Sequence, residues 1–378
     1  MILCRKNHKA FEMQFAQIQT IPEIMNVIKV LLTGVLAFVL AFSFTPLWTH
    51  FLYKYKIGIK IKETDVTGKK LNFVNKLHAA KAGTPTMGGV IVWVSVAVLA
   101  LLSHYLFPLI ADLTGTGFIA RLDFLRRSQT WLPLFALVAA GILGLCDDVM
   151  SVRGYGSNKG GGMRFAMRFW WLFAIAGAGA WWFYAKLGWD QLHVPGIGDF
   201  TIGWWYVPLF IFVILFGAVA SNETDGLDGL NAGVLVMAFA SFGLIAFLQN
   251  RVDLAALCAA IAGALLAFLW FNIYPARFFM GDTGSSSLGV ALGVVAMLTN
   301  SALVLFVIAF VYVLEAGSAT IQLTSKKLFG RKVFLAAPLH HHFEAKGWPE
   351  PKIVMRAWVF TAVTALTGVV IGILGMGK

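Results

Sequence analysis

Charged residues are scarce in this sequence. Asp, Glu, Lys and Arg make up 13% of the 378 residues, whereas soluble domains carry about 25%. Apolar residues make up 59%, and the mean hydropathy is +0.77. This scarcity of charge excludes a water-soluble globular domain and predicts a protein that is embedded in a membrane.

Cysteines and acidic residues are also few. The three cysteines, Cys4, Cys146 and Cys258, are scattered, which excludes a disulfide framework, and they lack metal-ligand spacing. There are 18 acidic and 30 basic residues, which gives a formal charge of +12. Nucleic acid is one conceivable partner, but in a membrane protein such an excess is typical of cytoplasmic loops that face anionic lipid. We therefore expect contact with membrane lipid and no nucleic-acid partner.

Long apolar runs dominate the chain. A helix needs about 20 apolar residues to cross a hydrocarbon core of about 30 Å. Ten segments approach or exceed this length: 27–50, 88–108, 130–147, 166–185, 205–221, 230–248, 253–271, 284–299, 301–322 and 355–375. They predict an all-α polytopic membrane protein with about ten transmembrane helices and cytoplasmic active-site loops. Residues 27–375 would form one integral-membrane domain, and the mixed stretch 1–26 an N-terminal extension or interfacial segment without the features of a cleavable signal.

Basic residues alternate from loop to loop. The loops after odd-numbered segments, together with the first residues of the segments that follow them, hold 20 Lys and Arg, and the intervening loops hold five. The positive-inside rule makes the first set cytoplasmic, and an even number of spans places both termini outside. Five carboxylates then fall on the cytoplasmic side: Asp147, Asp148, Asp225, Asp228 and Asp282. Any one of them could cap a helix at headgroup depth, but five on one face favour a shared polar site.

The densest polar motif is "SNETDGLDGLNAG", residues 221–233. Asn222, Asp225 and Asp228 are spaced by three, so on a helix they would share one face. Such oxygen-bearing side chains suit a hard cation, Mg²⁺ or Mn²⁺, or the hydrogen-bond donors of a polar ligand. The alternative is an ordinary turn between two spans.

A second motif, "NIYPARFFMGDTGSS", covers residues 272–286. Asp282 directly precedes an apolar run, which predicts a helix N-cap, and helix N-termini attract anions such as phosphate. Phe278 and Phe279 could stack on a base, although packing within the membrane is the commoner role of such residues.

Two further motifs supply hydrogen-bond donors. In "KAGTPTMGG", residues 81–89, Lys81 and Thr84 suit a phosphate, although a simple turn explains the stretch equally well. In "APLHHHFEAKGWPEP", residues 337–351, three histidines are consecutive, which disfavours a shared zinc ion. They favour hydrogen bonds to phosphate or proton transfer, with a solvated loop as the alternative. Carboxylates, a hard cation and these donors together suit metal-assisted phosphoryl transfer at a membrane surface, with a lipid phosphate as one substrate.

These motifs, together with "GLCDDV" at residues 144–149, resemble those of the phospho-N-acetylmuramoyl-pentapeptide transferase family. That family lies within the polyprenyl-phosphate N-acetylhexosamine-1-phosphate transferase superfamily, and the resemblance runs in order from about residue 27 to residue 375. The superfamily shares the carboxylate motifs, whereas "LHHHFEAKGWPEP" points to the muramoyl-pentapeptide members.

The resemblance implies an activity and its partners. Family members move phospho-MurNAc-pentapeptide from UDP-MurNAc-pentapeptide to undecaprenyl phosphate, giving lipid I and UMP for peptidoglycan synthesis, with Mg²⁺ as cofactor. They lie in the bacterial cytoplasmic (inner) membrane, with the active site facing the cytoplasm, and commonly form homodimers.

The resemblance also implies roles for individual residues. Asp147 matches the base that deprotonates the lipid phosphate, and the full set of catalytic matches is Asp147, Asp148, Asp282 and His341. Asp282 and Asp225 match the metal ligands. Phe279 matches the aromatic residue that packs on uracil, and the substrate-binding matches are Lys81, Thr84, Asn222, Asp225, Asp228, Phe279, His340 and His342.

The sequence departs from the family pattern in two places. Ser151 stands where the family has a lysine after the Asp pair, and a glycine-rich loop follows, so Arg153, Lys159 or Arg168 would have to take the basic role. Glu223 stands where the family has leucine. The sequence leaves open whether the lipid phosphate attacks directly or a carboxylate first forms a covalent intermediate.

Two other functions fit parts of the pattern. A sister transferase that uses UDP-GlcNAc would share the carboxylates, and only the histidine motif argues against it. An ion-coupled transporter would carry charges near the middle of its spans, whereas here the carboxylates gather at one face.

Overall fold

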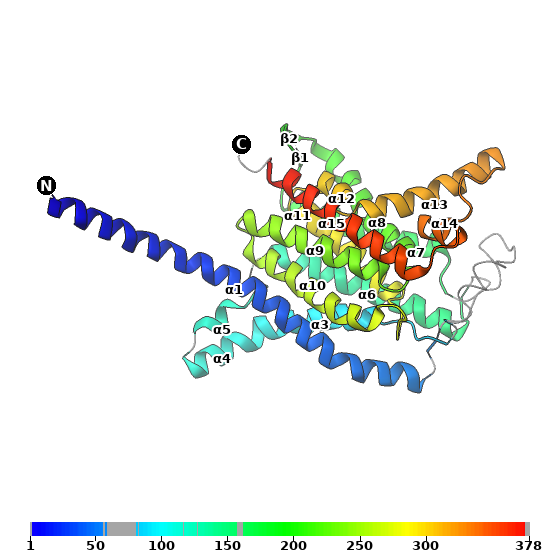
Figure 1. The fold of residues 1–378 in the computed structure, drawn as a ribbon, viewed down its shortest axis with the longest axis horizontal. Coiled ribbons are helices and arrows are strands. Elements are labelled where there is room, and N and C mark those ends of the chain that lie inside the picture. The colour runs from blue at the N-terminus through cyan, green and yellow to red at the C-terminus, as the bar shows by residue number, and fades with distance from the viewer. Residues whose placement is uncertain are drawn as a thin grey trace.

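The computed structural model describes residues 2–55, 57–58, 81, 83–115, 117–126, 128–156 and 162–374. Helices form nearly all of the secondary structure in these ranges and pack into one bundle (Figure 1). The predicted all-α polytopic fold is therefore confirmed.

Within these described ranges, seven stretches of helix are long and apolar enough to cross a membrane. The first lies within α1 (Ile2–Lys54), and the second runs through α3 (Gly89–Leu101), η2 (Leu102–Leu106) and α4 (Phe107–Thr114). The others are α6 (Ser128–Arg153), η4 (Gly203–Trp205) with α8 (Tyr206–Thr224), α9 (Leu230–Leu248), α10 (Val252–Asn272) and α15 (Glu350–Leu374). Each coincides with one of the ten predicted segments.

The remaining three predicted segments are helical but depart from simple spans. The fourth is α7 (Phe165–Trp181) continued by η3 (Trp182–Lys186), and the eighth is the shorter α11 (Asp282–Leu298). The ninth, predicted as one apolar segment over 301–322, is a pair of helices, α12 (Ala302–Ile308) and α13 (Phe310–Phe329), bent by 85°. The bend falls at Ala309, whose φ of −100° and ψ of 44° interrupt the helix. In the part of the chain that the structure describes, there are thus seven candidate spans, or eight if the bent pair forms one.

Helix α11 is the centre of the bundle. Every residue from Thr283 to Leu298 is buried, and α6, α8 and α3 pack around it. Glycines allow this close packing, because a Cβ on Gly217 of α8 would lie 3.1 Å from the carbonyl carbon of Gly289 in α11. Without a hydrophobic driving force between helices in lipid, small residues at such contacts let backbones approach.

Short elements complete the fold. These are α5 (Gly117–Arg121), α14 (Leu339–Ala345), and an antiparallel hairpin of β1 (Gln191–Val194) and β2 (Gly198–Thr201). The hairpin was absent from the predicted elements. Its turn contains Gly196 with a φ of 79°, a conformation that favours glycine. Helix α1 runs without a break across the predicted boundary at residue 26, and its N-terminal part extends beyond the bundle (Figure 1).

Candidate active site

The polar motifs meet at one end of the bundle. The C-terminal ends of α6 and α8 carry the Asp147–Asp148 pair and Asn222, and the N-terminal end of α11 carries Asp282. The loop before α9 carries Asp228, which contacts Lys81 before α3 and Glu350 at the start of α15. Residues far apart in the sequence therefore form a single polar region.

Asp148 caps the N-terminus of α11 from the neighbouring helix. Its Oδ1 accepts a hydrogen bond from the Asp282 N–H at 3.2 Å, and its Oδ2 accepts one from the Thr283 N–H at 3.0 Å. The N-cap position itself is Gly281, with a φ of 74°, and Asp282 is the first helical residue. The expected N-cap role of Asp282 is therefore wrong, because the capping oxygens come from Asp148. These two amides are also already bonded to a carboxylate, so they are not the open anion site that the sequence suggested.

Arg168 of α7 joins the carboxylates. Its Nη1 lies 2.7 Å from Asp282 Oδ2 and 3.5 Å from Asp147 Oδ2. Its Nη2 donates a hydrogen bond to Asn222 Oδ1 at 3.1 Å. Of the three basic residues considered for the position lost at Ser151, Arg168 contacts the site, Arg153 is exposed, and Lys159 lies outside the described residues.

The backbone after the glycine-rich loop wraps around Asp147. The Met163 N–H donates a hydrogen bond of 2.6 Å to Asp147 Oδ1. A Cβ on Gly162, whose φ is 86°, would lie 2.9 Å from that same oxygen. Glycine at position 162 therefore allows the chain to turn closely over the carboxylate.

Asn222 and Asp225 do not share a helical face as expected. Helix α8 ends at Thr224, and Asp225 has a φ of −83° and a ψ of 42°. The Asn222 amide donates hydrogen bonds to Asp282 Oδ1 and, at 3.0 Å, to Ser285 Oγ. Asp225 instead accepts a hydrogen bond from the Gly281 N–H. Burial raises the pKa of Asp225 well above its usual value, and the charge of Asp282 adds to this rise.

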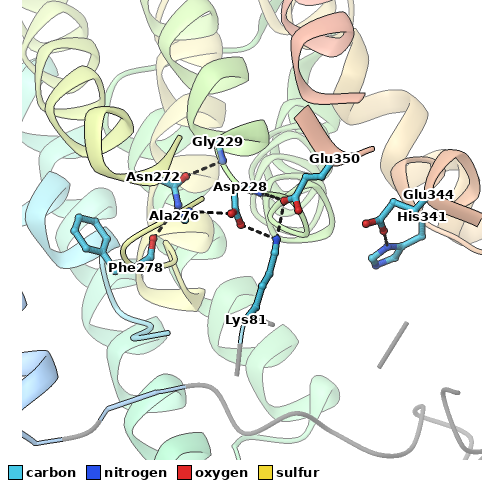
Figure 2. Close-up of polar contacts among 9 residues, drawn as sticks. All are labelled: Lys81, Asp228, Gly229, Asn272, Ala276, Phe278, His341, Glu344 and Glu350. Atoms are coloured by element: carbon cyan, nitrogen blue, oxygen red, sulfur yellow. Dashed lines mark hydrogen bonds and ion pairs between the residues drawn. The ribbon is translucent and has the colours of Figure 1, made fainter. Parts of the chain in front are cut away.

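A second group, the Lys81 triad, consists of Lys81, Asp228 and Glu350 (Figure 2). Lys81 Nζ lies 2.7 Å from Asp228 Oδ1 and 2.6 Å from Glu350 Oε1. The Ala276 N–H donates to Asp228 Oδ2 at 3.0 Å. Burial alone would lower the pKa of Lys81, but the hydrogen bonds and charges of the two carboxylates outweigh burial and raise it. Lys81 is therefore held as a cation.

Backbone hydrogen bonds tie the segment after Lys81 to the Asp282 motif. The Phe279 N–H donates to the Pro85 carbonyl, and the Gly88 N–H donates back to the Phe279 carbonyl, both at 2.8 Å. Thr84 belongs to the same segment, since its N–H donates to the Lys81 carbonyl at 3.2 Å. This pairing fixes Lys81 relative to Phe279.

The two adjacent phenylalanines have different surroundings. Phe278 is fully buried against Phe268 and Phe271, at centroid distances of 5.5 and 6.0 Å, so it is a packing residue. Phe279 is half-buried, and Lys81 Nζ lies 5.6 Å from its ring centroid. Asn272 orders this turn, since it accepts the Gly229 N–H at 3.0 Å and donates to the Phe278 carbonyl at 2.9 Å (Figure 2).

The three consecutive histidines on α14 point to different partners. His340 Nδ1 lies 3.0 Å from Glu315 Oε2, His341 Nδ1 lies 2.6 Å from Glu344 Oε2, and His342 Nδ1 accepts the Leu335 N–H at 3.2 Å. The His340 ring packs against Gly226, where a Cβ would lie 2.8 Å from its Cε1. Its Nε2 is buried and has no hydrogen-bond partner within the described residues. His340 thus faces the Asp225–Asp228 loop, whereas the His341–Glu344 pair lies apart from the Lys81 triad in Figure 2.

A metal centre is not preformed in the described part of the chain. No group of three or more His, Cys, Asp or Glu is arranged there to hold an ion. The predicted ligands Asp225 and Asp282 are nevertheless neighbours. Asp225 accepts a hydrogen bond from the N–H of Gly281, the residue before Asp282, and the charge of Asp282 helps to raise the pKa of Asp225. The backbone of Gly281 lies close to Asp148 and Thr86, because an added Cβ would lie 2.6 Å from Asp148 Oδ2 and 2.8 Å from Thr86 Oγ1.

Several residues at the site were not assigned from the sequence. The sequence offered Arg168 as one of three alternatives and predicted no role for Asn272, Glu315 or Glu350. Glu315 carried a usable signal, because a lone carboxylate inside an apolar segment usually faces a polar partner. Glu350 lies within the quoted histidine motif, but nothing in its spacing predicts a contact with Lys81.

The long apolar helices define an integral-membrane protein. Residues 130–300 match the model of Glycosyl transferase family 4, which makes it a membrane transferase. Residues 81–91 match signature 1 of the phospho-N-acetylmuramoyl-pentapeptide-transferases. A protein of that name from Levilactobacillus brevis is 36% identical over 358 residues, covering 91% of this chain and 98% of the relative. Relatives of the same name from Geobacillus thermodenitrificans and Chloroflexus aggregans are 35% and 34% identical, covering 89% and 92% of this chain and 95% and 90% of their own. The chain belongs to the phospho-N-acetylmuramoyl-pentapeptide-transferase family.

Proposed function

We propose that this chain transfers phospho-MurNAc-pentapeptide from UDP-MurNAc-pentapeptide to undecaprenyl phosphate, forming lipid I and releasing UMP. The observation that carries the proposal is the joining of the signature segment to the carboxylates: residues 85–89 hydrogen-bond to residues 279–280, directly before Asp282. Both halves of the site therefore lie where membrane helices end, which suits one lipid and one water-soluble substrate.

Asp147 is the proposed base for the lipid phosphate. Its Oδ1 is engaged by the Met163 amide, and its Oδ2 lies at the longer distance of 3.5 Å from Arg168. Oδ2, which faces Arg168 at this longer distance, is the oxygen proposed to accept a proton. Asp148, bonded to two amides of α11, would hold α6 and α11 in register beside it.

Asp282 and Asp225 are the proposed Mg²⁺ ligands. The surroundings suit a hard cation, because the charge of Asp282 acts on the carboxyl groups of Asp147, Asp148 and Asp225. Among these four residues, Arg168 contacts Asp147 and Asp282. When bound, Mg²⁺ would neutralise the diphosphate of the sugar donor and stabilise the leaving UMP. A cation on Asp282 would compete with Arg168 for that carboxylate.

Nucleotide binding is assigned to the Lys81 side of the site. Phe279 offers a half-buried ring for uracil, with Lys81 Nζ 5.6 Å from its centroid. Thr84, Asn222 and Asp228 are the further proposed contacts of the donor. His340, with its unpartnered Nε2 toward the Asp225–Asp228 loop, would bind a phosphate or sugar oxygen. His341 is held by Glu344 as a candidate proton carrier. His342 is proposed to contact the donor.

The membrane arrangement follows from charge. We place the site on the cytoplasmic side of the bacterial inner membrane because the loops at that end carry the basic excess. Both termini would then lie outside, and a homodimer is the expected assembly. Carboxylates at helix ends, rather than in the middle of spans, argue against an ion-coupled transporter.

A two-sugar assay tests the function. Purified protein in undecaprenyl-phosphate vesicles would be given UDP-MurNAc-pentapeptide or UDP-GlcNAc, each with Mg²⁺, and UMP release and lipid-linked product would be measured. We expect product from the first donor only, loss of turnover with EDTA, and recovery with added Mg²⁺. Product from UDP-GlcNAc alone would identify a sister transferase instead, and normal turnover in Asp282→Asn would refute the metal assignment.

A further inference from the structure

Glu350 links the C-terminal helix to two separate parts of the site. Its Oε1 accepts a hydrogen bond of 2.6 Å from Lys81 Nζ and another of 2.6 Å from the Asp228 N–H (Figure 2). The side chains are little exposed, at 17% for Lys81, 3% for Asp228 and 10% for Glu350. One carboxylate oxygen therefore joins the segment before α3, the loop before α9 and the first turn of α15.

A small apolar cluster fixes the position of Glu350. Leu227 and Leu230, on either side of the Asp228 loop, pack with Ile353 and Val354 of α15, and all four are buried. Trp358 Nε1 adds a hydrogen bond of 3.1 Å to the Gly229 carbonyl. The start of α15 is thus anchored against this loop independently of Glu350, which leaves the carboxylate free to act on the loop amide and on Lys81.

Lys81 needs two anchors to hold one position. A lysine side chain is long and flexible, and its ammonium is a point charge without directional preference. Asp228 alone fixes one direction, and its second oxygen is engaged by the Ala276 amide. Glu350 supplies the second direction, which leaves Lys81 Nζ 5.6 Å from the Phe279 ring centroid.

We propose that Glu350 is a positioning residue, which holds Lys81 beside Phe279 and fixes the Asp228 loop so that α15 completes the nucleotide-sugar side of the site. It acts through Lys81 and does not itself touch the reacting atoms. The proposal rests on the proposed function, because it assigns Lys81 to donor binding. It adds the C-terminal helix to the parts of the chain that set donor affinity.

Glu350→Gln is the informative variant. Glutamine has the same shape and keeps an oxygen acceptor for the Asp228 amide, but it removes one of the two charges that hold Lys81. Hydrogen bonds to charged groups are typically worth enough to change affinity about 10- to 100-fold. We expect kcat/KM for UDP-MurNAc-pentapeptide to fall by that factor, mainly through KM, with an unchanged Tm. Glu350→Asp should recover part of the lost kcat/KM. The control is Lys352→Gln, a nearby change at a residue that packs over Trp348, and it should leave kcat/KM unchanged.

The pH profile separates positioning from a purely structural role. Carboxylate contacts raise the pKa of Lys81, so its contribution is complete below the ordinary lysine pKa and is lost as pH rises through the higher, folded value. When the charge of Glu350 is removed, only Asp228 still opposes the effect of burial, so the pKa of Lys81 falls. The alkaline limb of kcat/KM in Glu350→Gln should therefore move to lower pH than in the wild type.

A double-mutant cycle decides the matter. Binding of UDP-MurNAc-pentapeptide would be measured in the absence of lipid phosphate for Glu350→Gln, Lys81→Met and the double variant. If Glu350 acts through Lys81, Glu350→Gln has less than a twofold effect in the Lys81→Met protein. Additive effects, or wild-type affinity and pH profile in Glu350→Gln, would overturn the proposal. Failure of the proposed function appears separately, as a wild-type protein that makes no lipid-linked product.

Discussion

Gly144 sets the distance between α6 and α11, the two helices that carry Asp147, Asp148 and Asp282, the carboxylates proposed to act in catalysis. It lies one turn before Asp148 in α6, directly against the first residues of α11. A Cβ at this position would lie 2.5 Å from the carbonyl carbon of Asp282 and 2.6 Å from Thr283 Cα. Those atoms belong to backbone inside the bundle, so they cannot rotate away as a flexible side chain would.

The expected effect of Gly144→Ala follows from this geometry. Ordinary van der Waals contact starts at 3.4 Å, so α6 and α11 must separate by about 1 Å, a displacement of the size that can lower turnover about 100-fold when it misplaces reacting groups. The two hydrogen bonds from α11 to Asp148 would lengthen, and Asp282 would move away from Asp147. Overpacking of this kind also costs about 1–3 kcal/mol of stability.

Lipid I formation in vesicles and thermal unfolding of the purified protein measure the two effects. Gly177→Ala is the matched control, because Gly177 lies within α7 and a Cβ there meets nothing within 4 Å. Alanine favours a helix over glycine by up to about 1 kcal/mol, so this control should be as stable as the wild type or slightly more so. The reasoning would be refuted if Gly144→Ala kept more than half of the wild-type turnover and melted together with the control.

Three other changes test separate parts of the site. Arg168→Met should lower kcat about 100-fold, because Arg168 contacts both Asp147 and Asp282. Arg168→Lys should recover little of this activity, since lysine lacks the planar guanidinium that reaches two partners. Steady-state kinetics measures both variants, and a wild-type kcat in Arg168→Met would contradict the prediction. Gly226→Ala should weaken donor binding by pushing the His340 ring aside, whereas Gly317→Ala, where a Cβ meets nothing within 4 Å, should not; calorimetric titration with the UDP-linked donor compares them. Phe278→Ala should lower the stability by about 3–5 kcal/mol, because the ring is fully buried, whereas Phe279→Ala should mainly raise KM; the reverse pattern in melting and kinetics would show that the two roles are misassigned.

The helices and their ends were predictable from the sequence because hydropathy acts locally. Within the described residues, seven of the predicted segments form helices long and apolar enough to cross a membrane, and the carboxylates lie at or just beyond helix ends. The bend at Ala309 was not predictable, since no proline or glycine marks it and the apolar run continues through it. The central position of α11 was likewise not predictable from hydropathy. A helix that is buried on all sides by other helices carries the same apolar pattern as one that is exposed to lipid.

Side-chain partners depended on tertiary contacts that spacing does not encode. The three-residue spacing of Asn222, Asp225 and Asp228 suggested one helical face, but α8 ends inside the motif and sends the side chains to separate partners. The capping of α11 was likewise invisible, because the capping carboxylate of Asp148 lies 134 residues earlier in the chain. Residue types predicted the chemistry of the site, and long-range packing determined which residue does what.

The departure at Ser151 has a structural explanation in the helix that follows. The basic group reaches the carboxylates from Arg168 on α7, one helix later than the family pattern places it. Between Ser151 and Arg168 the chain passes close to Asp147 at Gly162, where an added Cβ would lie 2.9 Å from Asp147 Oδ1 and 3.5 Å from Ser151 Cβ. A small residue at position 151 and glycine at position 162 thus leave room for this close passage, and Arg168 supplies the basic group. The glycine-rich loop ends in the turn that brings the Met163 amide to one oxygen of Asp147 and leaves the other facing the arginine.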